Sequence, residues 1–188
     1  MTVEEKVYNV IKERCEAPSN KYGIGAWDHH IKIVYELAKE YAEEYDADIE
    51  IVAIAALLHD IASVTDVSFT EEHHIIGAEI AEDILLSENY PIEKIALIKK
   101  CILNHRGSRL ADKTTGEEVC IADCDAMAHF YSIPSLLSMV YREKNLSIDD
   151  GSSFVMAKLD RSYNKMSDKG KQLVKRQYES AKNILKKI

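Results

Sequence analysis

The sequence predicts an all-α protein, and three observations lead to that prediction. Only 7 glycines and 3 prolines occur in 188 residues, which disfavours long loops and many tight turns. In several windows the apolar residues recur every three or four positions, the period of a helix with one buried face. No window alternates strictly between apolar and polar residues over the length of a strand. We therefore expect helices joined by short connections.

The expected helices are placed by their apolar faces and by residues that can begin them. Asp28 and Asp48 can cap the second and third helices through their carboxylates. Ser68 and Glu71 resemble a capping box that opens the fourth, and Pro91 suits the first turn of the fifth. The expected helices are about 2–16, 28–45, 48–60, 68–86, 91–104, 119–141, 154–165 and 168–187.

Three polar segments predict the longer breaks between these helices. They are residues 63–69, 106–116 and 149–153. The apolar stretch 119–141 is expected to form one helix, bent near Pro134 because proline removes a backbone donor.

Charge and hydropathy limit the classes of partner. Lys and Arg number 24 against 32 Asp and Glu, a formal charge of −8, so the chain lacks the basic footprint of a nucleic-acid-binding protein. The longest apolar run, 51–58, is far below the roughly 18 residues that a membrane span needs. The N-terminal residues 1–5 are acidic and contain no hydrophobic signal region. We therefore expect a cytoplasmic protein that binds neither membrane nor nucleic acid.

The most informative motif is the adjacent pair His59 and Asp60, which ends the apolar run that begins at Ala55. Adjacent helical residues point about 100° apart, so both can reach one metal ion only if the last turn opens. Histidine and carboxylate ligands suit Mn²⁺, Fe²⁺, Co²⁺, Ni²⁺ and Zn²⁺. The pair therefore predicts a metal site at the end of a buried helix.

Further candidate ligands occur on both sides of this pair. They are His30 (with His29 beside it), His73 or His74, His105, and Asp123 or Asp125.

With these residues the chain resembles the HD-domain superfamily of metal-dependent phosphohydrolases, from about residue 27 onward. Residues 28–30 together with 33–38 look like the first motif of the family. Residues 55–61 look like its second motif, and residues 121–127 look like its last. Residues 158–176 are similar to an uncharacterised branch. The resemblance implies an all-α, single-domain HD fold with additional C-terminal helices. Its parts would be an N-terminal helix and entry loop (1–26), a metal-binding core (about 27–145) and the C-terminal helices (about 149–188).

The resemblance also implies the ligands. The first metal site would use His30, His59, Asp60 and Asp125, with Asp123 kept as an alternative to Asp125. Some members bind a second ion, and the matching positions here are His73 and His105. We expect one or two divalent transition-metal ions per chain, with Mg²⁺ as a further possibility. His129 is expected to be structural or exposed.

The chemistry implied is hydrolysis, because a bound metal lowers the pKa of its water toward about 7. His59 and Asp60 are the expected catalytic residues, and Asp60 would also orient or deprotonate the water. Arg106, Arg109 and Lys158 are candidate substrate-binding residues, since cationic side chains suit phosphate. The alternative for the arginines is an exposed, solvated loop. The Gly-Lys that follows the HD pair in many members is replaced here by Ile61 and Ala62.

The expected function is hydrolysis of a phosphate ester or phosphoanhydride in a small molecule, with a nucleotide as the first choice of substrate. One alternative is a di-iron oxygenase on the same fold, and another is a regulatory domain that binds a nucleotide without turnover. No heptad seam indicates an oligomeric state.

Overall fold

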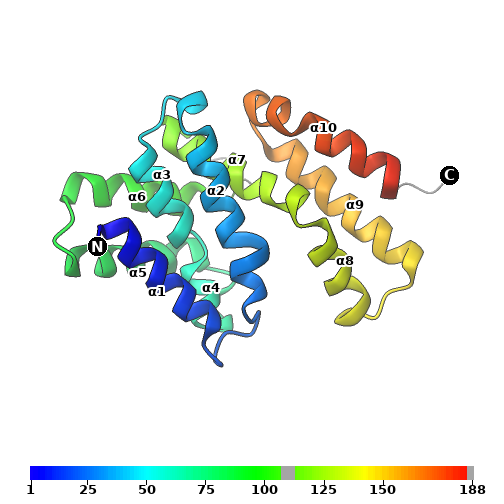
Figure 1. Ribbon diagram of the computed structural model, residues 1–188, viewed down its shortest axis with the longest axis horizontal. Coiled ribbons are helices and arrows are strands. Elements are labelled where there is room, and N and C mark those ends of the chain that lie inside the picture. Colours follow the sequence, from blue (N-terminus) through cyan, green and yellow to red (C-terminus); the bar gives the residue numbers. More distant parts are fainter. Residues whose placement is uncertain (107–112, 186–188) are drawn as a thin grey trace.

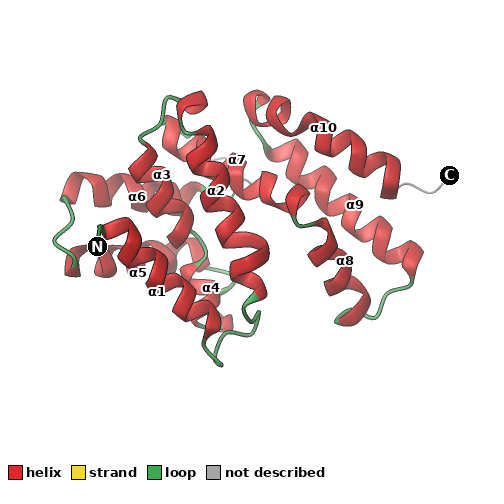
Figure 2. Cartoon of the chain, in the orientation of Figure 1, coloured by secondary structure: helices red, strands yellow, loops and turns green. Residues whose placement is uncertain are grey.

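The computed structural model describes residues 1–106 and 113–185, which form helices joined by short connections (Figures 1 and 2). No strand occurs in these described residues, so the all-α prediction is confirmed. Three short elements are a π-helical turn η1 (Trp27–Ile31) and two 3₁₀ turns, η2 (Glu43–Tyr45) and η3 (Val67–Phe69). The α-helices are α1 (Val3–Glu16), α2 (Lys32–Tyr41), α3 (Ile49–Leu58), α4 (Ile61–Thr65), α5 (His73–Ser87), α6 (Ile92–Asn104), α7 (Gly116–Tyr131), α8 (Ile133–Arg142), α9 (Ile148–Lys165) and α10 (Asp168–Leu185).

Helix α3 lies at the centre of the N-terminal part, where α1, α2, α5, α6 and α7 pack around it (Figure 1). Every residue from Ile51 to Leu58 is buried. A helix that is apolar on all sides must be enclosed by other elements, because any exposed face would leave apolar surface in water. The residues that follow α3 therefore enter the protein interior.

Helix α7 connects this part to the C-terminal helices. It packs on α2, α3 and α6, and it also contacts α9 and α10 (Figure 1). Thr115 and Glu118 form a capping box at its start, and the fully buried Glu118 also accepts a hydrogen bond from Asn104 Nδ2 at 2.6 Å. The start of α7 is thereby joined to the end of α6.

The C-terminal helices α8 and α10 each pack on α9, and all three contact α7. The rings of Tyr163 in α9 and Tyr178 in α10 stack at 3.9 Å between centroids, and the Tyr178 hydroxyl donates to Asp160 at 2.8 Å. Within the described part of the chain, no helix combines the length and the apolar character needed to cross a bilayer.

Two predicted helix starts are wrong. Asp28 does not cap the second helix, because it lies inside the π-helical turn η1. Ser68 and Glu71 do not form a capping box: α5 begins at His73 without a side-chain cap. Asp66 caps η3 instead, accepting from the Ser68 backbone at 2.8 Å.

The expected helices and breaks differ from the structure in three further places. The segment 149–153 is the first part of α9, because Ser147 caps Asp150 N and Gly151 lets α9 approach the Tyr141 ring. The stretch 119–141 forms two helices rather than one bent helix: α7 ends at Tyr131, and Pro134 lies in the first turn of α8. The segment 63–69, expected as a loop, contains the end of α4 and the turn η3.

The close approach of η2 to the start of α7 gives a stability prediction. A methyl group at Gly116 would overlap the carbonyl oxygen of Tyr45, and a main-chain atom cannot rotate away. We expect Gly116→Ala to lower the free energy of unfolding by about 2 kcal/mol, measured by urea denaturation. Gly25→Ala is the matched control, since its methyl group would meet only the His29 ring at 3.8 Å. Equal effects of the two substitutions would contradict the packing argument.

Candidate metal centre

His59 and Asp60 lie at the junction between α3 and α4. Helix α3 ends at Leu58, and Asp60 has φ −110° and ψ 14°, outside the helical region. The helical path therefore opens at the pair, as two adjacent ligands of one ion require. His59 is fully buried, and the Asp60 carboxylate is partly exposed.

Three histidines are oriented in the same way. Each one is held by a main-chain carbonyl oxygen in the helix end or turn to which it belongs. In His59, His73 and His105, Nδ1 donates to the carbonyl oxygen three residues earlier, at 2.7, 2.7 and 2.5 Å. A proton fixed on Nδ1 leaves the lone pair on Nε2, which is the form that binds metal ions. All three side chains are thus prepared as Nε2 ligands.

His30 brings a fourth imidazole to the HD pair from the π-helical turn η1. Its Nε2 lies 3.2 Å from His59 Nε2, 3.4 Å from Asp60 Oδ2 and 3.3 Å from Asp125 Oδ1. Single π-helical turns occur often at functional sites, because the extra residue redirects a side chain. The structure therefore gathers four predicted ligands: His30, His59, Asp60 and Asp125.

The other two predicted ligands meet on the opposite side of Asp60. His73 Nε2 lies 3.1 Å from His105 Nε2, and Asp60 Oδ1 lies 3.4 Å from His73 Nε2 and 4.0 Å from His105 Nε2. Asp60 Oδ2 thus faces His30 and His59, and Asp60 Oδ1 faces His73 and His105.

The spacing of these donor atoms fits metal ions. Two nitrogens bound at about 2.1 Å to one ion lie about 3.0 Å apart at a right angle and about 3.4 Å apart at the tetrahedral angle. The observed separations are 3.2 Å for His30 and His59, and 3.1 Å for His73 and His105. Three groups of side chains could hold an ion: His30, His59 and Asp60; Asp60, His73 and His105; and His30, Asp125 and His129.

Both carboxylates are held in the ionised form. Burial alone would raise the pKa of Asp60, but His59 and His30 hold that pKa well below its usual range. Burial likewise opposes ionisation of Asp125, whose pKa is held well below its usual range by Lys165 and His30. Anionic carboxylates are the form that coordinates a cation.

The histidines respond to burial in different ways. Burial favours neutral His30, but hydrogen bonds to Asp125 and Asp60 outweigh it and raise its pKa to about 9. Burial and the neighbouring His59 lower the pKa of His105 to about 4. Without metal, His30 is therefore positively charged and His105 is neutral at neutral pH.

The structure adds residues at this site that were not among the predicted ligands. Lys165 Nζ lies 3.0 Å from Asp125 Oδ2. His129 stacks on His30 with centroids 5.6 Å apart, and its Nδ1 shares a hydrogen bond with Ser162 Oγ at 2.9 Å. The sequence does contain one indication of Lys165. It lies seven residues after the candidate Lys158, and residues seven apart lie on the same face of a helix.

Asp123, the alternative to Asp125, has other partners. Its Oδ2 accepts from the Tyr45 hydroxyl at 2.8 Å, and its Oδ1 accepts from Ser167 N at 3.0 Å. The Ser167 hydroxyl also donates to this carboxylate. Residues two apart on a helix point about 200° away from each other, so Asp123 and Asp125 cannot both face His30. Asp123 joins η2 to the start of α10.

The remaining candidates have separate environments. His29 is exposed, and His74 is buried outside the three groups that could hold an ion. Arg106 donates from Nη1 to the Glu71 carbonyl oxygen at 2.6 Å, so it connects the end of α6 to the start of α5. Lys158 is half-buried, and burial lowers its pKa against the opposing charge of Asp125. The predicted substrate-binding residue Arg109 lies outside the described residues.

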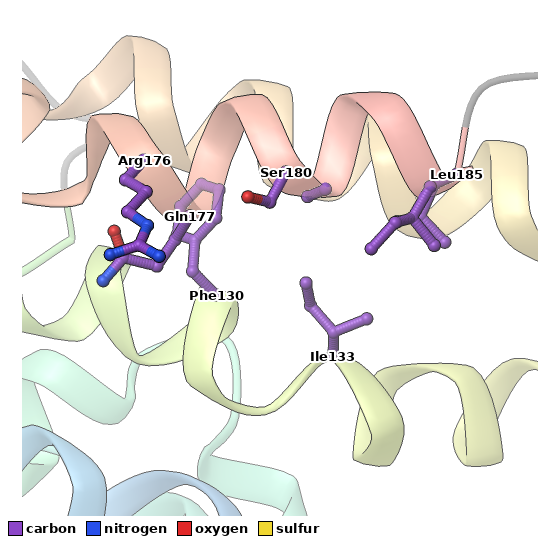
Figure 3. A pocket seen from close by; sticks show the side chains of 8 residues that line it. Phe130, Ile133, Arg176, Gln177, Ser180 and Leu185 are labelled. Carbon is purple, nitrogen blue, oxygen red and sulfur yellow. The ribbon is translucent and has the colours of Figure 1, made fainter.

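An apolar groove of about 340 Å³ lies elsewhere, between α10 and the junction of α7 with α8 (Figure 3). Phe130 and Ile133 form one wall, and residues of α10, including Arg176 and Leu185, form the other. None of the predicted site residues lines this groove, so it is distinct from the histidine and aspartate cluster.

Residues 27–129 match the HD domain family, which is more than half of the chain and includes the whole of both histidine pairs. The chain belongs to the HD domain family. The match ends before α9, so Lys158 and Lys165 lie outside it.

Two solved proteins show the same fold over most of the chain. A predicted HD superfamily hydrolase from an uncultured Thermotogales bacterium is 25% identical, with a TM-score of 0.58 over 84% of this chain and 89% of that one. Bacillus subtilis YpgQ is 20% identical, with a TM-score of 0.70 over 98% of this chain and 94% of that one. The structure of YpgQ in complex with ADP is 19% identical, with a TM-score of 0.65 over 94% of this chain and 90% of that one. The fold is that of an HD superfamily hydrolase.

One curated relative is a tRNA (cytidine(56)-2'-O)-methyltransferase of Thermoplasma volcanium, 37% identical over 84 residues. The match covers 43% of this chain and 23% of that protein, so the chain spans less than a quarter of its length.

The two aspartates of α7 should respond differently to substitution. Asp123→Ala removes the acceptor of Tyr45 and Ser167, and we expect unfolding free energy to fall by about 2 kcal/mol with metal content retained. Asp125→Ala should sharply reduce bound metal. Thermal unfolding and elemental analysis of both variants test this. Loss of metal from well-folded Asp123→Ala would reverse the assignment.

Metal loading should release a proton from His30. Below its pKa of about 9 His30 is protonated in the metal-free protein, whereas a ligand imidazole must be neutral. We expect release of about one proton with the first ion at pH 7.5, declining as pH rises through 9. Calorimetric titration with Mn²⁺ in buffers of different ionisation enthalpy measures this number. Proton release that stays constant up to pH 10 would contradict it.

Proposed function

We propose that this protein is a metal-dependent phosphohydrolase that cleaves a phosphate ester or phosphoanhydride bond in a small molecule, with nucleotides as its substrate class. The observation that carries the proposal is the position of Asp60 between two pairs of inward-facing imidazole Nε2 atoms. Membership of the HD domain family supports it, and so does the ADP complex of the similarly folded YpgQ.

Two ion sites fit the donor atoms. The first would use His30, His59, Asp60 Oδ2 and Asp125 Oδ1, and the second His73, His105 and Asp60 Oδ1. Mn²⁺, Fe²⁺, Co²⁺, Ni²⁺ and Zn²⁺ are the ions that this mixture of nitrogen and oxygen ligands favours. A bound ion would supply a polarised water molecule and neutralise charge on the phosphoryl oxygens.

The residues of the chain perform the remaining tasks. Asp60 is ionised, so its carboxylate can orient the attacking water by accepting a hydrogen bond from it. Water forms the new bond to phosphorus while the bond to the leaving oxygen breaks, and the proton that the water gives up is taken up by the leaving oxygen. His59 is held immobile by its bond to the main chain, which fixes the reacting geometry. Helix α3 excludes water from the interior side.

The test is a substrate screen on the metal-loaded protein. Protein loaded with Mn²⁺, Co²⁺, Ni²⁺ or Fe²⁺ should release phosphate or pyrophosphate from members of a nucleotide panel. We expect His59→Ala and Asp60→Asn to lower kcat/KM by at least about 10³-fold, because each removes a ligand and reacting geometry. Chelation should abolish turnover, and added metal should restore it.

His29→Ala is the matched control, since this imidazole adjoins His30 but is exposed. It should keep both metal and activity. Nucleotide binding without hydrolysis by any loaded form, or iron-dependent oxygen consumption in place of phosphate release, would overturn the proposal.

A further inference from the structure

One face of α9 lines the metal cluster with hydrogen-bond donors. Lys158, Ser162 and Lys165 are spaced i, i+4 and i+7, which places them on the same side of the helix. Lys165 pairs with Asp125, Ser162 bonds with His129, and the charge of Lys158 acts on both Asp125 and His129. Three residues of one helix therefore approach the same side of the cluster.

The contact to Asp125 leaves Lys165 free to bind a further group. Asp125 uses Oδ1 toward His30 and Oδ2 toward Lys165, so it can serve the metal site and the lysine at once. An ammonium group has three donors, and this contact uses one of them. Lys158 has no hydrogen bond or ion pair with any residue of the described chain, although it is half-buried. Donors thus remain for an anionic ligand.

The α9 face adds positive charge to the cluster. Lys165 Nζ lies 3.0 Å from Asp125 Oδ2, and the charge of Lys158 acts on the same carboxylate. Divalent ions would add further positive charge. Near neutral pH a single phosphate group carries about two negative charges, whereas a diphosphate or triphosphate chain carries three or four and offers more oxygen atoms to the two lysines.

We infer that this face of α9 binds the second phosphate group of the substrate, which makes the enzyme selective for nucleoside diphosphates and triphosphates over monophosphates. The inference rests on the proposed function. The Cα atoms of residues seven apart on a helix are separated by about 10 Å, so Lys158 and Lys165 can contact different phosphate groups of one chain. The metal cluster would hold the phosphate that reacts, and α9 the neighbouring one.

The experiment compares Lys158→Met, Lys165→Met and the double variant, which keep side-chain length and remove charge. Lys175→Met is the matched control, because Lys175 is an exposed lysine of α10. Calorimetry measures the affinity of the metal-loaded proteins for inorganic pyrophosphate and inorganic phosphate. Kinetics measures kcat/KM for a nucleoside triphosphate and for an aryl phosphodiester, which has a single phosphate.

We expect the double variant to lose at least 30-fold in pyrophosphate affinity and in kcat/KM for the triphosphate. Compared at equal metal occupancy, which elemental analysis measures, phosphate affinity and kcat/KM for the aryl phosphodiester should fall at least tenfold less than the values for pyrophosphate and the triphosphate. Lys165→Arg should recover part of the loss, since it restores the charge. If the double variant does not unfold cooperatively, the single variants provide the same comparison.

Unchanged pyrophosphate affinity in the double variant, absence of pyrophosphate binding by the parent protein, or an equal loss on both substrates would overturn the inference. These outcomes are separate from failure of the proposed function, in which the parent protein hydrolyses no phosphorylated compound. In that case the pyrophosphate titration alone decides whether α9 binds a diphosphate.

Discussion

Burial of α3 on every side is the constraint on which the rest of the structure depends. Because its whole length is apolar, the chain that leaves it must start from the interior, and His59 is fully buried there. A polar pair in that position needs partners, since an unpaired buried polar group is costly. Four other elements supply them: η1, α5, α6 and α7 each deliver an imidazole or a carboxylate to the end of α3. The helices around α3 thus form its apolar cover and the ligand cluster at once.

Helix α7 extends this arrangement to the C-terminal part. Asp125 faces the cluster, whereas Asp123 bonds to Tyr45 and Ser167. One helix therefore both contributes to the metal centre and fixes the position of the chain that begins α10. The α9 residues Ser162 and Lys165 reach the cluster only because α7 and α9 pack side by side.

Much of this could be predicted from sequence, because apolar periodicity and the HD pair are local signals. The central helix falls in this class, whereas the histidines that cluster with the pair were implied by the resemblance to the HD-domain superfamily. The π-helical turn at His30 was not predicted, because no local sequence pattern distinguishes such a turn from the start of an α-helix; Trp27 and Ile31, at its two ends, are buried. Lys165 was not predicted because an exposed helical lysine and a half-buried, ion-paired one look the same in sequence. The break expected at 149–153 is absent. Glycine in a sequence usually indicates a turn, but Gly151 lies inside a helix and allows close packing against the Tyr141 ring.

The bonds from three imidazole Nδ1 atoms to main-chain carbonyls have a wider consequence. Many metal centres orient their histidines with carboxylate side chains, which a single mutation can remove. Here the acceptors belong to Ala56, Thr70 and Ile102, and any residue at those positions presents the same carbonyl oxygen. The orientation of these imidazoles is therefore insulated from side-chain replacement in their surroundings. The identity of each ligand depends on the residue at its position. The main-chain carbonyl oxygen that orients the ligand depends only on where its helix ends or its turn forms.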